Sequence, residues 1–252
     1  MAASAGDRHS AAVGEDGALF VWGSGVNGRL ETGYNDRRLA PVRVAGLPAP
    51  VRQVAAGFYH TGIVTEAGDL LMCGCGEYGR LGLGDEDDRT IPTRVERAVF
   101  DGEAVLMVDC GWYHTVVLTE GGGVYTFGHG EYGQLGHGDE ENQLAPRRVP
   151  AAGFNGERVV MVATGNFHSV GLSEEGHVFT WGLGECGRLG HGDWDNHMAP
   201  RQVEAGRFGG ERVVFVAAGG NHTVAVTAGG GCTRWGGVRL VSWAMATPAA
   251  GW

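Results

Sequence analysis

The sequence contains no lysine, and its charge balance is acidic. All 19 basic residues are arginine, 29 residues are acidic, and the formal net charge of the 252-residue chain is −10. Nonspecific binding to nucleic acid or to an anionic membrane requires a basic surface, which this balance disfavours. We therefore expect neither nucleic acid nor a membrane surface among the partners of the protein.

Long apolar segments are missing as well. No apolar run approaches the roughly 20 residues of a membrane span, and residues 1–9 have no hydrophobic segment of the signal-peptide type. The five cysteines are odd in number, and Cys73-Gly74-Cys75 lacks the spacing of a zinc-ligand pair or a redox pair. These absences predict reduced, packed cysteines in an intracellular protein, either cytoplasmic or nuclear.

Glycine, by contrast, is abundant and regularly placed. The chain has 47 glycines, well above the average share of about 7%. A glycine, two residues and then His-Ser or His-Thr recur five times, with the histidine at His9, His60, His114, His168 and His222. These histidines are 51, 54, 54 and 54 residues apart. A fixed period of this size indicates one supersecondary unit copied in tandem.

Each unit carries the signals of four short strands. In the clearest unit, the expected strands are residues 159–163, 169–173, 177–181 and 199–203, separated by glycine-containing turns. Residues 182–193 form a glycine-rich loop, and Pro200 suits a strand at a sheet edge. Four short antiparallel strands without helical periodicity are typical of a propeller blade.

The same residue types recur at matching positions of the other units. An aromatic residue ends the third strand at Trp22, Phe127, Trp181 and Trp235. The following loop repeats a glycine at Gly79, Gly133 and Gly187. We interpret these residues and the five histidines as structural positions of the repeated fold.

These motifs resemble the regulator of chromosome condensation repeat family. The family pattern begins at His-Thr and continues through an aromatic-Gly strand end and a Gly-x-x-Gly-x-Leu-Gly-x-Gly loop to a proline, as found from His114 to Pro146. The resemblance covers residues 6–236 and implies an all-β fold, a β-propeller of four-stranded antiparallel blades. Because members usually close a ring of seven blades, we expect an incomplete propeller of about four and a half blades, begun within a blade, over residues 1–236.

Residues 237–252 depart from the repeat. The glycine-rich loop should follow Trp235-Gly236, but the sequence there does not match it. Reading each codon one base earlier makes glycine compulsory at positions 244 and 246, where the motif has glycine. We interpret this tail as frame-shifted or as the product of a misjudged exon boundary. An incomplete ring would also leave open sheet edges, which favour pairing with another chain.

Three motifs that could suggest chemistry have structural explanations. Gly-x-Gly-x-x-Gly occurs four times, but a dinucleotide site needs a helix directly after it, and the best copies continue as Leu-Gly-His-Gly-Asp. The five histidines lie one unit apart, so we expect them to secure turns rather than to share a metal ion. The acidic residues 85–88 lack the spacing of a calcium loop. We therefore expect no catalytic residue, cofactor, metal or small-molecule substrate.

Aromatic residues beside the turn histidines vary between units. They are Phe58, Tyr59, Trp112, Tyr113 and Phe167. Other units have Asp7-Arg8 or Gly220-Asn221 at these positions, so the shared fold does not require the rings. Two interpretations stay open. The rings pack between blades, or they form an interaction surface, since aromatic residues on one rim are typical binding anchors.

The resemblance implies a protein-binding module with no chemistry of its own. The family uses this architecture in exchange factors for small GTPases, in ubiquitin ligases of the HERC kind and in scaffold proteins, so the fold does not name the partner. Our first hypothesis is a protein–protein interaction scaffold, and the alternative is guanine-nucleotide exchange on a small Ran-like GTPase. Ultraviolet sensing occurs among relatives with Gly-Trp-Arg-His-Thr repeats, but here Trp112 alone fits, followed by Tyr113.

Overall fold

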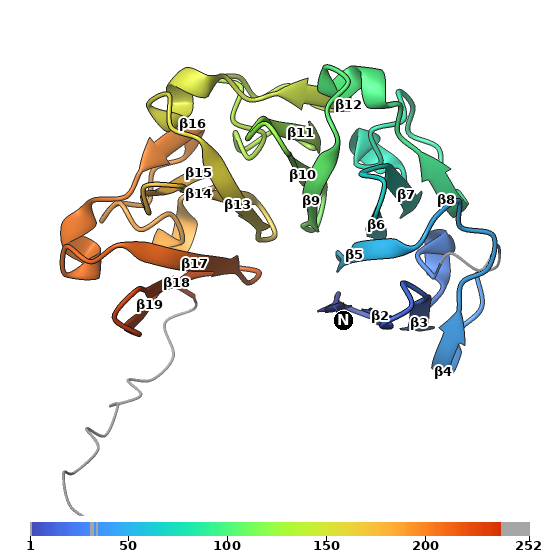
Figure 1. Ribbon diagram of the computed structural model, residues 1–252. Helices are drawn as coiled ribbons and strands as arrows, with labels where there is room; N and C mark the ends of the chain where they lie inside the picture. Colours follow the sequence, from blue (N-terminus) through green and yellow to red (C-terminus); the bar gives the residue numbers. More distant parts are fainter. Residues whose placement is uncertain (1, 31–32, 34, 238–252) are drawn as a thin grey trace, which may run out of the picture.

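The protein is a curved row of antiparallel sheets. The computed structural model describes residues 2–30, 33 and 35–237, so the tail interpreted above lies outside the described residues from position 238 on. The described part forms five sheets side by side along an arc (Figure 1), which we call blades 1 to 5 in chain order. The predicted all-β propeller architecture is confirmed.

The strands follow one another within each blade in chain order. Blade 1 contains β1 (Ala2–Ala5), β2 (His9–Val13), β3 (Leu19–Gly23) and β4 (Arg38–Arg43). Blade 2 contains β5 (Val51–Ala56), β6 (His60–Thr65), β7 (Leu70–Gly74) and β8 (Arg89–Arg94). Blade 3 contains β9 (Val105–Cys110), β10 (His114–Thr119), β11 (Val124–Gly128) and β12 (Gln143–Arg148). Blade 4 contains β13 (Val159–Thr164), β14 (His168–Ser173), β15 (Val178–Gly182) and β16 (His197–Gln202). Blade 5 contains β17 (Val213–Ala218), β18 (His222–Thr227) and β19 (Cys232–Gly236).

The first blade corrects one expectation from the sequence. Ala2–Ala5 pairs with β2, with Ala2 opposite Val13, so blade 1 is four-stranded and the expectation that the chain begins within a blade is wrong. The described residues thus form four blades of four strands and a fifth of three. The first strands of the blades face the centre of the arc, and the fourth strands lie on its outer side (Figure 1).

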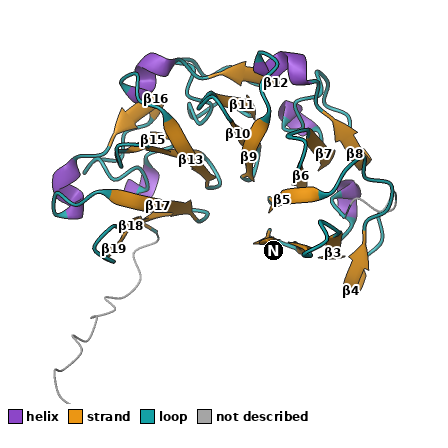
Figure 2. Ribbon diagram, viewed as in Figure 1, coloured by secondary structure: helices purple, strands orange, loops and turns teal. Residues whose placement is uncertain are grey.

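Short 3-10 helices occupy segments that the sequence predicted as loops (Figure 2). Three lie in the glycine-rich loops: η1 (Val26–Gly28), η2 (Glu77–Gly79) and η5 (Glu185–Gly187). Three join successive blades: η3 (Arg97–Phe100), η4 (Ala151–Phe154) and η6 (Ala205–Phe208). Tyr78, inside η2, has a φ of 62°, so this turn does not continue as a helix.

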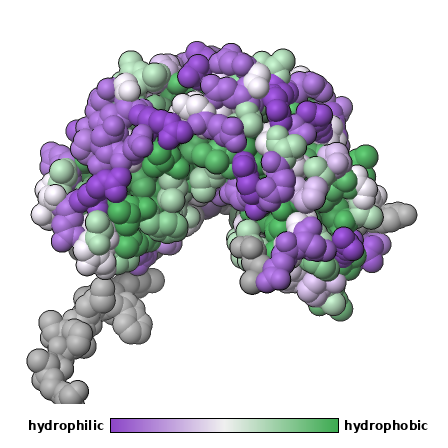
Figure 3. All heavy atoms as spheres, viewed as in Figure 1, coloured by the Kyte–Doolittle hydropathy of each residue, from purple (hydrophilic) through white to green (hydrophobic). Residues whose placement is uncertain are grey.

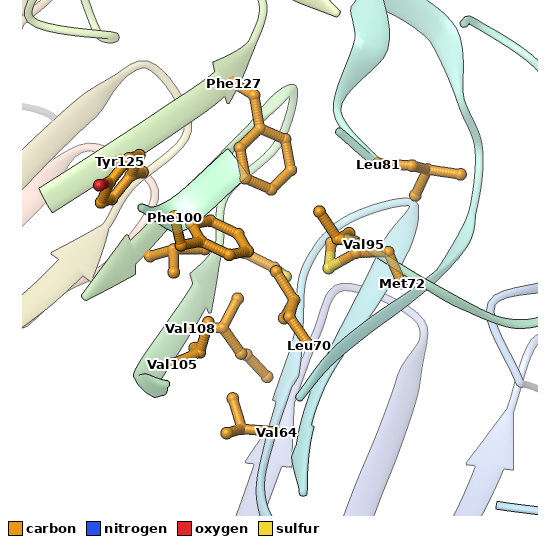
Figure 4. Close-up of a cluster of buried hydrophobic side chains, with 13 residues drawn as sticks. Val64, Leu70, Met72, Leu81, Val95, Phe100, Val105, Val108, Tyr125 and Phe127 are labelled. Carbon is orange, nitrogen blue, oxygen red and sulfur yellow. The ribbon is translucent and has the colours of Figure 1, made fainter. Parts of the chain in front are cut away.

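The hydrophobic cores lie between neighbouring blades. In the core of blades 2 and 3, Leu70 and Met72 from one blade meet Phe100 and Phe127 from the other side (Figure 4). The space-filling view shows hydrophobic residues toward the inner side of the arc and hydrophilic residues over much of its outer rim (Figure 3). Neighbouring blades therefore bury their facing surfaces against each other, as expected for a tandem repeat.

The burial of the third-strand aromatic position differs between blades. Phe127 and Trp181, in inner blades, are fully buried, whereas Trp22 and Trp235, in the first and last described blades, are half-buried. Cys73 takes the same position in blade 2 and is buried. Cys232 is exposed, so the expectation that the cysteines are packed is wrong for this residue.

The loop glycines bring each blade close to the next one. Gly79 has a φ of +77°, and a Cβ on it would collide with the backbone of Leu144 on β12. Gly133 is placed in the same way, since its Cβ would lie 2.6 Å from the Cα of Met198 on β16. The loop of one blade thus rests directly on the fourth strand of the next blade, which only a residue without a side chain allows.

Candidate functional site: an aromatic face above buried histidines

The turn histidines hold neighbouring blades together. The Nε2 of His60 lies 2.8 Å from the Oγ1 of Thr115 in the next blade, and His114 is likewise 2.9 Å from Ser169. His9 and His168 make the matching contacts to Thr61 and Thr223, at 2.8 and 3.0 Å. The sequence predicted that these histidines secure turns. The structure shows that they also bond side chains of the next blade.

The hydroxyl partners fix the tautomer of these histidines. Thr115 donates its single hydroxyl proton to the carbonyl of Arg80 at 2.8 Å, and Ser169 donates to the carbonyl of Gln134 in the same way. Each hydroxyl can therefore only accept from the imidazole, so His60 and His114 carry their proton on Nε2. The Nδ1 atoms of both residues are buried without a hydrogen-bond partner.

Burial keeps the histidines neutral. Burial lowers the pKa of His114 and of His168 to about 3, and burial together with the nearby Arg29 lowers the pKa of His9 to about 4. The pKa of His60 lies well below the ordinary value for the same reason. Successive histidines each serve a different pair of blades, and no group of three metal-ligating side chains occurs in the described part of the chain. The arrangement supports a structural use of these residues.

Above the histidines, aromatic side chains from three blades form one surface, which we call the aromatic patch. Its members are half-buried, and they are Phe58, Tyr59, Tyr78, Trp112, Tyr113, Tyr132 and Phe167. They come from the turns between first and second strands and from the glycine-rich loops. Since consecutive strands are antiparallel, these turns and loops lie on the same face of the arc.

The rings of the aromatic patch contact one another across the blades. Phe58 stacks on Trp112 with ring centres 4.6 Å apart, and Trp112 stacks on Tyr113 at 5.2 Å with an angle of 9° between the rings. Phe167 of blade 4 continues the row, 5.4 Å from Trp112. The structure therefore brings together the five aromatic residues singled out in the sequence.

A buried arginine supports the patch from below. The guanidinium of Arg80 is fully buried, lies 4.9 Å from the ring centre of Tyr113, and donates to the carbonyls of Glu77 and Trp112. Its Nη2 also lies 3.0 Å from the Glu77 carboxylate, which is more than half exposed. A cation under tyrosine rings is an attractive arrangement, and it fixes the position of the rings.

Sequence reasoning missed Tyr78, Tyr132 and Arg80 as members of this surface. A signal for the two tyrosines was present, because each stands in a Gly-Glu-Tyr-Gly segment at the same position of its loop. A signal for Arg80 was present as well, because arginine recurs at its position as Arg29 and Arg188, with Gln134 in blade 3, and all four residues are buried.

Acidic groups border the aromatic patch. Glu77 and Glu131 are exposed beside Tyr78 and Tyr132. Within residues 85–88, Asp88 accepts from the Gly76 N–H at 2.9 Å, and Asp85 pairs with Arg89 at 2.6 Å. Part of this acidic loop therefore stabilises the conformation of the surrounding loop. The face thus combines apolar rings with negative charge at the rim.

None of the helices in the described residues is long or apolar enough to span a membrane.

Comparison with known proteins agrees with this architecture. The family model described as "RCC1-like domain" matches residues 1–236. The chain belongs to the RCC1-like domain family. Within that family, the chain is 39% identical to the ultraviolet-B receptor UVR8 of Arabidopsis thaliana over 92% of its own length and 51% of that protein.

Two further relatives show how much of other proteins the RCC1-like domain covers. The chain is 37% identical to the human E3 ubiquitin-protein ligase HERC2, over 94% of its own length but 5% of that protein. The crystal structure of human WBSCR16 superposes with a TM-score of 0.84 at 27% identity, covering 93% of this chain and 61% of that one. The chain therefore spans about half of UVR8 and a small part of HERC2.

Proposed function

We propose that the protein is an interaction scaffold that binds a protein partner through the aromatic patch and performs no chemistry of its own. One observation carries this proposal: a continuous row of half-buried rings crosses three blades at positions that the fold leaves variable. Aromatic residues that are held rigid and partly exposed lose little entropy on binding, which makes them effective anchors. The acidic rim adds a preference for a partner segment that carries basic groups.

The test compares partner capture by a double variant within the patch and a control variant outside it, both of which replace apolar side chains with serine. The double variant Phe58→Ser with Trp112→Ser removes the centre of the patch. The control variant Leu39→Ser removes an apolar side chain that is 90% exposed on β4, away from the patch. We expect the protein and Leu39→Ser to capture the same partner from cell extract and the double variant to lose it. If all three capture the same proteins, the patch is not the binding site.

Nucleotide exchange on a Ran-like GTPase is the alternative function. It is measured by the release of fluorescent mant-GDP from Ran. A scaffold leaves the release rate unchanged at micromolar protein, whereas an exchange factor accelerates it, and the Trp112→Ser variant would then show whether the patch is involved.

Light sensing, the function in the name of UVR8, has less support in this chain. The relatives that sense ultraviolet light do so through clustered tryptophans. The aromatic patch contains one tryptophan, Trp112, with Phe58 and Asn166 at the equivalent positions of the neighbouring blades.

A further inference from the structure

The link between blades 1 and 2 is shorter than the links between the later blades. Six residues separate Val44, which follows β4, from Val51, which begins β5, whereas nine residues separate the equivalent valines of each later link. The later links each form a 3-10 helix, η3, η4 or η6, whereas residues 44–50 form none. Every residue of this short link is described, and it lies inside the chain.

Each of the later links places a phenylalanine between two blades. These residues, Phe100, Phe154 and Phe208, are all buried. The ring of Phe100 lies 5.2 Å from that of Tyr125 on the third strand of the following blade (Figure 4), and Phe154 lies 5.5 Å from Phe179 in the same arrangement. This position of the repeat therefore accepts a phenyl ring.

The junction of blades 1 and 2 lacks both rings of this pair. The short link contains no phenylalanine, and Leu71 takes the position of Tyr125 and Phe179 on the third strand of blade 2. Leu47 of the link packs against the core that contains Leu71, but it is only half-buried. Smaller side chains thus stand where the later junctions hold two aromatic rings.

Two cavities flank the short link. One has a volume of about 230 Å³, and its walls are residues 45–48 together with Leu71, Ile91 and Pro92. The other has a volume of about 730 Å³ and lies between the link and residues 16–19 of blade 1. Residues 45–48 line both cavities, so the two spaces lie on either side of the same segment.

The fourth strand of blade 2 is also left uncovered at this junction. In blade 4, η4 packs on β16, and Pro200 is buried close to Gly153 of that helix. The equivalent Pro92 of blade 2 is only half-buried. Beside it, Ile91 is 60% exposed at a position where the other three fourth strands have alanine. An exposed isoleucine at the mouth of a cavity offers apolar surface to an incoming side chain.

The neighbouring charge indicates what accompanies the ring. In the next link, Arg97 donates to the carbonyl of Ala67 at 2.6 Å and to the carboxylate of Asp69 at 2.8 Å, and so joins the link to a turn of blade 2. The equivalent turn of blade 1 carries Asp16, whose side chain is 67% exposed and lies 3.8 Å from Arg43. Asp16 is therefore open to a basic group that approaches along the larger cavity.

We propose that the junction of blades 1 and 2 binds a partner-protein segment that carries a phenylalanine in a tight turn, with a basic residue three positions before it. The ring enters the cavity over Leu71 and contacts Ile91, and the basic residue pairs with Asp16. Because consecutive strands are antiparallel, this junction lies at the opposite end of the strands from the aromatic patch. The protein then has two docking faces, and the two proposals stand independently.

The test uses the full chain and a fluorescently labelled peptide with the sequence of residues 96–103, Glu-Arg-Ala-Val-Phe-Asp-Gly-Glu. We expect saturable binding by fluorescence anisotropy. A matched peptide carrying Phe100→Ser should bind about tenfold to a hundredfold more weakly, because the ring supplies most of the buried apolar surface.

Two protein variants locate the binding site. Ile91→Ser removes apolar surface at the smaller cavity, and Leu39→Ser removes an exposed apolar side chain from the fourth strand of blade 1. We expect Ile91→Ser to bind the peptide several-fold more weakly and Leu39→Ser to bind it as the unaltered protein does. Both side chains are largely exposed, so both variants should keep the circular dichroism spectrum of the protein.

Three results would overturn the proposal. They are the absence of saturable binding up to on the order of 1 mM peptide, equal binding of the two peptides, and equal binding by the Ile91→Ser and Leu39→Ser variants. The double variant Phe58→Ser with Trp112→Ser should bind the peptide as the unaltered protein does. Failure of the patch proposal therefore leaves this result unaffected.

Discussion

Nε2 of His114 lies 2.9 Å from the Oγ of Ser169 in the next blade, and both residues are fully buried. Replacing the histidine in His114→Ala removes this bond and leaves a cavity between the blades. We expect a loss of about 2–4 kcal/mol in the free energy of unfolding. Urea denaturation followed by circular dichroism measures the loss.

A double-mutant cycle isolates the bond itself. Ser169→Ala leaves the Nε2–H of His114 buried without an acceptor, which costs about 1–3 kcal/mol. If the two groups stabilise each other, the double variant loses less stability than the sum of the single variants, by about 1 kcal/mol. Additive losses would show that the contact contributes nothing to stability.

The same histidines predict acid sensitivity. An unfolded histidine takes up a proton near pH 6.5, whereas burial holds the pKa of His114 and His168 at about 3 and that of His9 at about 4. The unfolded state therefore binds more protons below pH 6.5. The stabilisation is complete above that pH and is lost as the pH falls, by up to about 1.4 kcal/mol per pH unit for each histidine.

The pH range separates this effect from the carboxylates whose pKa is lowered, whereas Asp109, whose pKa burial raises, acts in the opposite direction. The pKa values of Asp139 and Glu157 are lowered by their hydrogen bonds to Arg147 and Ser173, so these groups affect stability only below their ordinary range near pH 4. We expect the urea midpoint to fall between pH 7 and pH 5. A constant midpoint over that interval would mean that the histidines are not buried in the neutral form.

The repeat made the architecture predictable from the sequence. A glycine or histidine that returns every 54 residues marks a backbone requirement, so the strands and the turn at His114 could be placed before the structure was known. The partner of that histidine could not be placed, because Ser169 is 55 residues away and periodicity does not specify which atoms of two neighbouring units meet.

The aromatic patch was predictable only in part. Variation at a repeated position singled out Trp112 and Phe167, but a sequence pattern does not show that their rings touch. Arg80 recurs as Arg29 and Arg188 in other blades, but the repeat does not show that its guanidinium lies buried beneath a tyrosine ring. Contacts of this kind depend on the angle between blades, which no single repeat encodes.

Two glycines with similar φ values allow the cost of a left-handed backbone to be measured apart from the cost of a collision with the next blade. Gly79 and Gly84 have φ of +77° and +88°, but a Cβ on Gly84 meets nothing within 4 Å, whereas one on Gly79 collides with the backbone of Leu144. We expect Gly84→Ala to cost about 1 kcal/mol from the left-handed conformation alone. Gly79→Ala should cost about 3 kcal/mol or more, because the next blade must move. Equal losses in urea denaturation would show that the loop does not rest on the neighbouring blade in solution.

The stability losses caused by replacing two tryptophans distinguish packing from binding as the role of the aromatic patch. Trp181 is fully buried in the core between blades 3 and 4, and Trp181→Ala should cost about 3–5 kcal/mol. Trp112 is half-buried on the face, so Trp112→Ala should cost no more than about 1–2 kcal/mol.

Denaturation of both variants under the same conditions makes the comparison. A small loss of stability in Trp112→Ala means that the stacked rings serve a purpose other than stability, because the blades already pack against one another through their hydrophobic cores. A loss as large as that at Trp181 would identify the rings as part of the packing between blades, and the partner would then have to bind elsewhere on the arc.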